Sequence, residues 1–301
     1  MTIEQQIQDW KRERDAVILA HYYVAPEVQE IADYVGDSFY LSKVALDLPQ
    51  QTIVFCGVGF MGESAKLLNE KKTVLMPDLE ADCPMAHMAQ PEEIRKIREQ
   101  EEDLAVVCYI NSTAALKACA DVCVTSANAL DVVRALPNRK ILMIPDQNLA
   151  HFIAEQVPEK EFLFHPGCCP VHQEIRLSEV LDLKKAHPEA PVLAHPECPA
   201  ALLAHADYVG STSGIIRYAA EHEAREYIIC TEIGVRHRLE RDNPGKKFYF
   251  PATSPACRDM KQVTLEKVLE VLRTGKNAVS LPGEQSEMAR RALEQMLRLA
   301  K

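Results

Sequence analysis

Short runs of apolar residues alternate along the chain with stretches in which apolar residues recur at helical spacing. The apolar runs are continuous, as expected for strands that are covered on both faces of a parallel sheet. The helix-period stretches between them include SFYLSKVALDL (38–48), ANALDVVRAL (127–136) and GIIRYAAEH (214–222). Because parallel strands need crossover helices, the alternation predicts an α/β fold. Two more helical stretches, LEKVLEVL (265–272) and EQSEMARRALEQMLRLAK (284–301), predict a helical tail.

One seven-residue segment occurs three times, as ADYVGDS at 32–38, ADVCVTS at 120–126 and ADYVGST at 206–212. The copies are separated by 88 and then 86 residues, and their flanks repeat at matching offsets. The preceding apolar runs are AVILAHYY (16–23), LAVVCYIN (104–111) and APVLAHPEC (190–198). We therefore predict three homologous αβα sandwich units with small parallel sheets, arranged around a pseudo-threefold axis. The predicted units are residues 1–86, 87–172 and 173–301, the last including the helical tail.

Composition and net charge argue against several classes of function. Hydrophobic residues make up 47% of the chain and charged residues 26%, which is ordinary for a globular protein. A net charge of −10 argues against a general nucleic-acid or anionic-membrane surface. No apolar run reaches the roughly 18 residues that a membrane span needs. The first residues, MTIEQQIQDWKRERD, lack the apolar core of a signal peptide. We expect a cytoplasmic protein with no nucleic-acid or membrane partner.

The chain contains ten cysteines, a high number for a cytoplasmic protein. Disulfides are disfavoured in that compartment, so the thiols indicate metal binding, catalysis or simple burial. Cys56, Cys108 and Cys230 lie within strand-like apolar runs. We expect these three to be buried, because cysteine then behaves as a small hydrophobic residue.

Functional residues are expected at equivalent positions of the three units, which are separated by 88 and then 86 residues. In α/β sheets, ligands bind at the carboxyl ends of the strands, and three related units can direct these ends to one centre. The first such set is Ser38, Ser126 and Thr212, where each repeated segment leads into a helix. Taken singly, each is a natural helix N-cap. As a converging set, they and the helix N-termini favour a phosphate or carboxylate ligand.

A second set follows the first apolar run of each unit. His21, Tyr109 and His195 occupy equivalent positions, and Tyr23, Asn111 and Glu197 lie two residues further on. A single histidine is more often a structural residue, but a set of polar groups at strand ends predicts a substrate-binding rim. Glu197 is a candidate general base if a buried, anion-rich site tunes its pKa.

The third set consists of Cys83, Cys169 and Cys257, which are separated by 86 and 88 residues. One thiolate from each unit could bind a metal on the common axis. Structural zinc sites usually have four ligands, often in Cys-x-x-Cys pairs, and these cysteines have no such partner. A [4Fe–4S] cluster held by three cysteines keeps one iron open, and an open iron is a Lewis acid. Position alone does not separate Cys169 from its neighbour Cys168.

Six segments resemble the quinolinate synthase family, and together they cover essentially the whole chain in order. They are GFMGESAK (59–66), VCYINSTA (107–114), VTSANA (124–129), PGCCPVH (166–172), LAHPEC (193–198) and ACRDMKQVTLEKVL (256–269). The resemblance implies a [4Fe–4S] cluster on Cys83, Cys169 and Cys257, and the family pattern G-x-C-x-V-H selects Cys169 over Cys168. It also implies condensation of iminoaspartate with dihydroxyacetone phosphate to quinolinate in NAD biosynthesis, with a functional link to L-aspartate oxidase.

The resemblance also implies residue roles. The implied substrate contacts are His21, Ser38, Tyr109, Asn111, Ser126, His195, Glu197 and Thr212. The implied catalytic candidates are Glu197, Tyr23 and His195. Glu63 and Lys66 match family positions as well, although they could simply form a helix pair of structural value. Some family members carry a Cys-x-x-Cys at the third ligand, whereas this chain has Met260 there, so thiol–disulfide control at that place is not available.

Two other functions compete with this interpretation. One is a different three-cysteine [4Fe–4S] hydro-lyase of the aconitase type, against which the threefold repeat argues. The other is a non-catalytic iron or redox sensor, which leaves the polar rim and the hydroxyl set unexplained.

Overall fold

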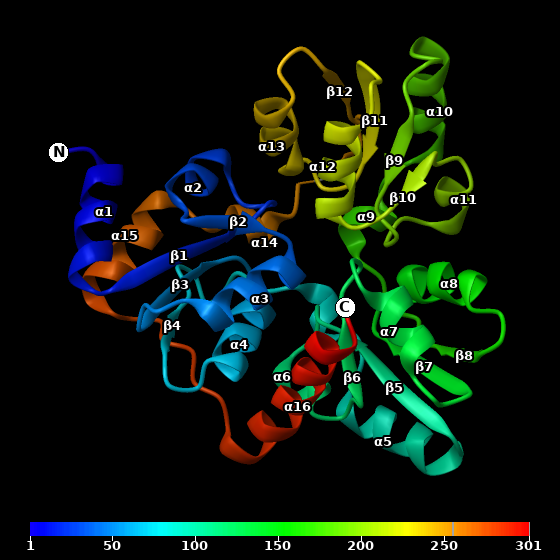
Figure 1. The fold of residues 1–301 in the computed structure, drawn as a ribbon, viewed down its shortest axis with the longest axis horizontal. Helices are drawn as coiled ribbons and strands as arrows, with labels where there is room; N and C mark the ends of the chain where they lie inside the picture. The colour runs from blue at the N-terminus through cyan, green and yellow to red at the C-terminus, as the bar shows by residue number, and fades with distance from the viewer. Residues whose placement is uncertain (255, 301) are drawn as a thin grey trace.

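The computed structural model describes residues 1–254 and 256–300. It contains three four-stranded parallel sheets, each covered by helices, and the three units surround a common centre (Figure 1). All three sheets have the same strand order, in which the first strand of the unit lies between the second and the third. This confirms the predicted α/β class and the three homologous units, while the boundaries after residues 86 and 172 remain predictions.

The first sheet has the order β2-β1-β3-β4. Its strands are β1 (Ala16–His21), β2 (Tyr34–Gly36), β3 (Thr52–Cys56) and β4 (Thr73–Leu75). The helices of this part are α1 (Ile3–Glu13), α2 (Pro26–Ile31), α3 (Ser38–Asp47), α4 (Gly59–Leu68) and the 3₁₀ helix η1 (Pro84–His87).

The second sheet has the order β6-β5-β7-β8. Its strands are β5 (Leu104–Tyr109), β6 (Val122–Val124), β7 (Lys140–Ile144) and β8 (Glu161–Phe164). Its helices are α5 (Pro91–Gln100), α6 (Ala114–Lys117), α7 (Ala129–Ala135), α8 (Gln147–Gln156) and α9 (Pro170–Gln173).

The third sheet has the order β10-β9-β11-β12. Its strands are β9 (Val192–Ala194), β10 (Tyr208–Val209), β11 (Glu226–Cys230) and β12 (Lys247–Tyr249). Its helices are α10 (Leu177–Ala186), α11 (Ala200–Leu203), α12 (Thr212–Glu221), α13 (Val235–Asp242) and α14 (Arg258–Lys261).

The aspartate of the repeated segment makes the same hydrogen bond in each unit. In each unit the carboxylate accepts the backbone N–H of the neighbouring first strand: Asp33 from Ile18 (2.8 Å), Asp121 from Val106 (2.7 Å) and Asp207 from Val192 (2.7 Å). The strands β1 and β5 are buried along their whole length, as their continuous apolar pattern predicts. The side chains of Cys56, Cys108 and Cys230 are fully buried, which confirms that expectation.

The C-terminal tail packs on the first two units. Helix α15 (Leu265–Thr274) lies against α1, and α16 (Gly283–Leu299) lies against α4, α6 and β6 (Figure 1). Between these helices, Ala278 forms an antiparallel bridge with Leu75, which covers the free edge of β4. An exposed strand edge is a template for aggregation, so the tail protects the first sheet. Across residues 1–254 and 256–300, no helix combines the length and apolarity that a bilayer crossing requires.

Glu63 and Lys66 do not pair with each other. A carboxylate oxygen of Glu63 accepts the backbone N–H of Ala114 at the start of α6 (2.7 Å), so it connects the first unit to the second. The ammonium of Lys66 donates to the carbonyls of Glu70 and Lys72, both at 2.8 Å. The simple helix pair that the sequence allowed is therefore not formed.

Candidate active site

All the predicted site residues line one cavity between the three units. They are His21, Tyr23, Ser38, Cys83, Tyr109, Asn111, Ser126, Cys169, His195, Glu197, Thr212 and Cys257. They converge because parallel strands of one sheet end at the same edge, and the three sheets direct this edge inward. His21 and Tyr109 are the last residues of β1 and β5, and His195 directly follows β9.

The hydroxyl set does not cap its helices. The N-cap of α3 is Asp37, whose carboxylate accepts the N–H of Tyr40 (2.9 Å), and the N-cap of α12 is Ser211, whose hydroxyl accepts from Gly214 (3.1 Å). Helix α7 begins after Asn128. The N-cap interpretation of Ser38, Ser126 and Thr212 is therefore wrong. Since other residues take the capping positions, these three hydroxyls remain available to the cavity.

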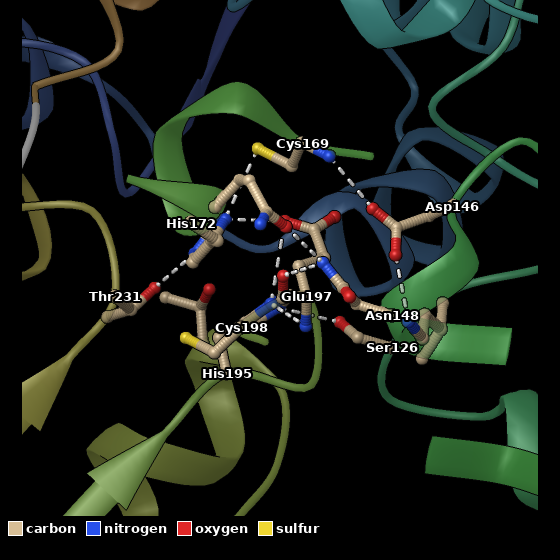
Figure 2. A network of polar contacts seen from close by, with 12 residues as sticks. Ser126, Asp146, Asn148, Cys169, His172, His195, Glu197, Cys198 and Thr231 are labelled. Atoms are coloured by element: carbon tan, nitrogen blue, oxygen red, sulfur yellow. Dashed lines mark hydrogen bonds and ion pairs between the residues drawn. The ribbon is translucent and has the colours of Figure 1, made fainter. Parts of the chain in front are cut away.

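A chain of short polar contacts runs across the cavity from Tyr23 to Glu197. The hydroxyl of Tyr23 lies 2.7 Å from that of Thr212 and 2.9 Å from that of Thr231. The other side of the Thr231 hydroxyl is 2.9 Å from Nε2 of His172. Nδ1 of His172 in turn lies 2.7 Å from a carboxylate oxygen of Glu197 (Figure 2). These contacts join groups of all three units, because Tyr23, His172 and Glu197 come from different repeats.

Burial and neighbouring charges determine which of these groups are neutral and which are ionised. Burial lowers the pKa of His21 and of His195 to about 3, so both imidazoles are neutral. Burial and the nearby Glu197 carboxylate raise the pKa of Tyr109 well above its usual range. Burial also acts to raise the pKa of Glu197, but His172, His195 and the Tyr109 hydroxyl outweigh it and lower that pKa to about 2. Glu197 is an ionised carboxylate with one oxygen 2.7 Å from Nδ1 of His172, while its Oε1 is buried without a hydrogen-bond partner among the described residues.

The three cysteines occupy the same local structure in each unit. Cys83, Cys169 and Cys257 are the N-cap residues of the short helices η1, α9 and α14. Burial raises the pKa of Cys83 to about 12, and the pKa values of Cys169 and Cys257 are raised as well. All three cysteines line the same cavity. Three cysteine ligands suit an iron–sulfur cluster, which would bind them as thiolates.

The structure also separates the two adjacent cysteines. Cys169 lines the cavity with Cys83 and Cys257, whereas Cys168 is not among the lining residues. The backbone N–H of Cys168 points to the sulfur of Met88 at 3.4 Å. The position of Cys169 agrees with the family pattern.

A tighter group of donors could hold a single ion. Ligand atoms of Cys169, His172 and Glu197 lie within 4.8 Å of one another. However, His172 already uses both ring nitrogens, one toward Glu197 and the other toward Thr231. Hydrogen bonding therefore accounts for the closeness of this group without an ion.

Two buried carboxylates were missed by the sequence analysis. Asp146 accepts the backbone N–H of Cys169 (3.0 Å), and Glu232 accepts that of Cys257 (2.9 Å). They follow β7 and β11 by two residues and are separated by 86 residues, so the repeat spacing contained the signal. The equivalent residue of the first unit is Val58, and there Asp82 accepts the N–H of Cys83 (2.8 Å). His172 and Thr231 were also missed, although His172 lies in a segment that resembles the family.

Comparison with known proteins agrees with this geometry. The model of the quinolinate synthetase A protein family matches residues 5–298. A quinolinate synthase of Fusobacterium nucleatum is 49% identical, with 99% of each chain covered. That of Clostridioides difficile is 48% identical over 98% of this chain and 97% of its own, and that of Aquifex aeolicus 45% identical over 99% and 94%. The chain belongs to the quinolinate synthetase A family.

Proposed function

We propose that this protein is a quinolinate synthase that condenses iminoaspartate with dihydroxyacetone phosphate, releasing phosphate and water, in the formation of NAD. The single observation that carries the proposal is the cavity itself, in which a hydroxyl set, a polar rim and three cysteines meet at equivalent positions of the three units. Membership of the family supports the same reaction.

Both substrates are anions, and the cavity offers donors for them. Ser38, Ser126 and Thr212 supply hydroxyls suited to a phosphate or a carboxylate. Tyr109, Asn111 and His195 supply a phenol, an amide and a neutral imidazole suited to the dicarboxylate. His21 is a further neutral imidazole at this rim. Asp37, Glu197 and Glu232 also line the cavity, so these uncharged donors have to outweigh the repulsion from carboxylates to bind both anions together.

Proton transfer is assigned to the chain of contacts between Tyr23 and Glu197. Tyr23 is protonated, since burial and Glu197 raise its pKa well above the usual value. Its hydroxyl can donate to a substrate oxygen while Thr212 and Thr231 hold it in place. Glu197 is ionised, and its lowered pKa makes it a weak base, so its role as proton acceptor, directly or through His172, rests on its position. Isomerisation and dehydration each need one group that donates a proton and another that accepts it.

Cys83, Cys169 and Cys257 are the proposed ligands of a [4Fe–4S] cluster. The donor set fits it, because each thiol comes from a separate unit, all three line the same cavity, and a bound metal would hold them as thiolates. When bound, the cluster would supply an open iron that acts as a Lewis acid on a substrate oxygen. We further propose a cytoplasmic location and a functional link to L-aspartate oxidase, because iminoaspartate must come from the oxidation of aspartate.

Anaerobic purification tests the proposal. A brown protein with about four irons per chain that forms quinolinate from the two substrates is expected. A colourless protein with zinc bound by Cys169, His172 and Glu197 would refute the cluster. A protein that holds the cluster but leaves both substrates unchanged would instead favour an iron or redox sensor. Turnover of a hydroxy acid by dehydration alone would favour an aconitase-type hydro-lyase.

A further inference from the structure

The loops that follow the first strand of each unit, residues 22–25, 110–113 and 195–199, are here called the rim loops. A short helix follows directly after each of them. These helices are α2, α6 and α11, which begin at the equivalent residues Pro26, Ala114 and Ala200. Near their ends, the equivalent positions hold Gln29, Lys117 and Leu203. Two of the three side chains are polar, yet Gln29 is only 3% exposed and Lys117 is fully buried. Leu203 shows that this fold accepts an apolar side chain at the position, so folding alone does not require a polar one.

Gln29 holds the loop that carries Tyr23. Its side-chain amide donates to the carbonyls of Tyr22 (2.9 Å) and Val24 (3.0 Å), the residues on either side of Tyr23. The same amide is 3.3 Å from the carbonyl of Gly234, which belongs to the third unit. One buried amide therefore fixes the rim loop and joins it to the neighbouring unit.

Lys117 makes the equivalent contact in the second unit. Its ammonium donates to the carbonyl of Ser112, the residue after Asn111, and Ser112 is equivalent to Val24. The ammonium also lies 5.4 Å from the ring centre of Phe60, which belongs to the first unit and lines the cavity. Lys117 takes part in none of the ion pairs between described residues, and burial lowers its pKa despite the nearby Glu63 carboxylate. Burial of an ammonium group without a charged partner costs free energy, which indicates that the contacts made by Lys117 serve a function.

In the third unit the donor comes from the opposite side of the interface. Leu203 cannot donate, but the side-chain amide of Asn148 donates to the carbonyl of Glu197 (2.9 Å) and to the side chain of Gln173 (3.0 Å). Figure 2 shows Asn148 beside Glu197. Asn148 is equivalent to Phe60 and Gly234, the residues that Lys117 and Gln29 contact. Each interface involves the same two repeat positions, that of Gln29, Lys117 and Leu203 and that of Gly234, Phe60 and Asn148. In each interface, the residue at one of these two positions supplies the hydrogen-bond donor.

We propose that Gln29, Lys117 and Asn148 are positioning residues, one for each rim loop, which hold Tyr23, Asn111 and Glu197 at the geometry that the reaction needs. This inference rests on the proposed function. Each donor binds a carbonyl of its loop and at the same time contacts a second segment of the chain. Since a displacement of about 1 Å can reduce a rate on the order of a hundredfold, small loosening of a rim loop has a large effect.

Substitution of Lys117 provides the sharpest test, because the equivalent residue of the first unit, Gln29, shows which replacement keeps the hydrogen bond. Lys117→Gln introduces the residue that makes the same bond in the first unit, whereas Lys117→Met keeps the length and loses the donor. With the cluster-loaded enzyme, Lys117→Met is expected to raise the KM for iminoaspartate about tenfold or more, through Asn111. Lys117→Gln is expected to recover most of this loss. The control is Lys184→Met, which removes a similar lysine-to-carbonyl bond (2.8 Å to Ala190) outside the cavity.

Hydrogen–deuterium exchange supplies a readout that does not depend on activity. Residues 109–113 are expected to exchange faster in Lys117→Met and at the wild-type rate in Lys117→Gln and Lys184→Met. If Lys117→Met does not fold, Asn148→Leu tests the inference instead. We expect this variant to exchange faster at residues 195–198 and to have a lower kcat. Its control is Asn243→Leu, which loses a buried amide bond to Leu239 (2.9 Å) elsewhere.

Unchanged exchange and an unchanged KM in Lys117→Met would overturn the inference. Equal losses in the Met and Gln variants would do so too, because a merely space-filling role would not be rescued by glutamine. If wild-type protein forms no quinolinate, the proposed function fails, and the exchange measurement still decides whether these side chains hold the rim loops.

Discussion

The hydroxyls of Tyr23 and Thr212 lie 2.7 Å apart although 189 residues separate them in the chain. Tyr23 follows the first strand of the first unit, and Thr212 begins a helix of the third. A second contact, to Thr231 at 2.9 Å, fixes the phenol from the other side. This part of the cavity therefore exists only when the first and third units are docked.

Removal of the Tyr23 hydroxyl is expected to stop proton transfer without unfolding the protein. Tyr23→Phe should lower kcat by roughly a hundredfold or more, since a positioned acid or base contributes that much. The loss of its hydrogen bonds should cost only about 1 kcal/mol of stability. Steady-state kinetics and urea unfolding measure the two effects. Tyr22→Phe is the control, because the neighbouring Tyr22 does not line the cavity, and equal kcat values in the two variants would contradict the assignment.

The neighbours Ser211 and Thr212 separate helix capping from substrate binding. Ser211→Ala removes the cap of α12 and should cost about 1 kcal/mol of stability, with little change in the KM for dihydroxyacetone phosphate. Thr212→Val keeps the cap but removes a cavity hydroxyl, so we expect the KM to rise on the order of tenfold. Thermal unfolding and kinetics on both variants test this contrast. A larger KM effect from Ser211→Ala would exclude the role proposed for Thr212.

The choice between the two adjacent cysteines can be tested by substitution. Cys169→Ala should abolish the cluster, seen as loss of iron and of brown colour after anaerobic purification, because its thiol lines the cavity. Cys168→Ala should retain iron at the wild-type level. Circular dichroism checks that both variants are folded. Loss of iron in Cys168→Ala alone would reverse the assignment.

Acid should destabilise the protein through two buried histidines. His21 and His195 have a pKa of about 3 in the folded state against a usual value of 6.5, so below pH 6.5 the unfolded chain binds more protons. The contribution of these two histidines is complete above about pH 6.5 and falls by up to about 2.7 kcal/mol per pH unit as the pH drops toward 3. Asp146, whose pKa burial raises to about 8, acts in the opposite direction and offsets up to about half of this slope. Urea unfolding of the metal-free protein at pH 7 and pH 5.5 measures this slope.

A substitution separates this effect from general acid denaturation. His21→Asn should lower the slope by up to about 1.4 kcal/mol per pH unit, because only one of the two buried imidazoles then remains to be protonated. His205→Asn, at an exposed position, is the control and should leave the slope unchanged. An undiminished slope in His21→Asn would show that other groups cause the acid sensitivity.

The sequence predicted most of the fold because a repeat makes weak local signals reinforce one another. A strand of three residues such as β6 is hard to detect alone, but its equivalents in the other units locate it. The repeat also brought together the cavity residues, since equivalent positions meet wherever three units face one centre. Asp146 and Glu232 have the same spacing, but their unit-one equivalent is Val58, so the set did not stand out as three polar residues.

Other features depend on tertiary contacts that spacing does not report. The direction of the Glu197 pKa shift results from His172, which a separate unit brings within 2.7 Å. The capping residues Asp37 and Ser211 precede the hydroxyls by one position, a difference smaller than the usual uncertainty of helix boundaries. Nor does helical periodicity tell which surface a helix covers, and α16 packs on α4 and α6 rather than on the third unit.

The position of the tail has a consequence for the order of events during synthesis. The first sheet leaves the ribosome early, yet the strand edge at Leu75 is covered by Ala278 and its unit by α15 and α16, which are translated after all three sheets. Domains generally fold as they emerge, and an uncovered strand edge is prone to aggregation meanwhile. The nascent chain therefore exposes this edge until the segment that follows the third sheet has emerged, and only then can the first unit be completed.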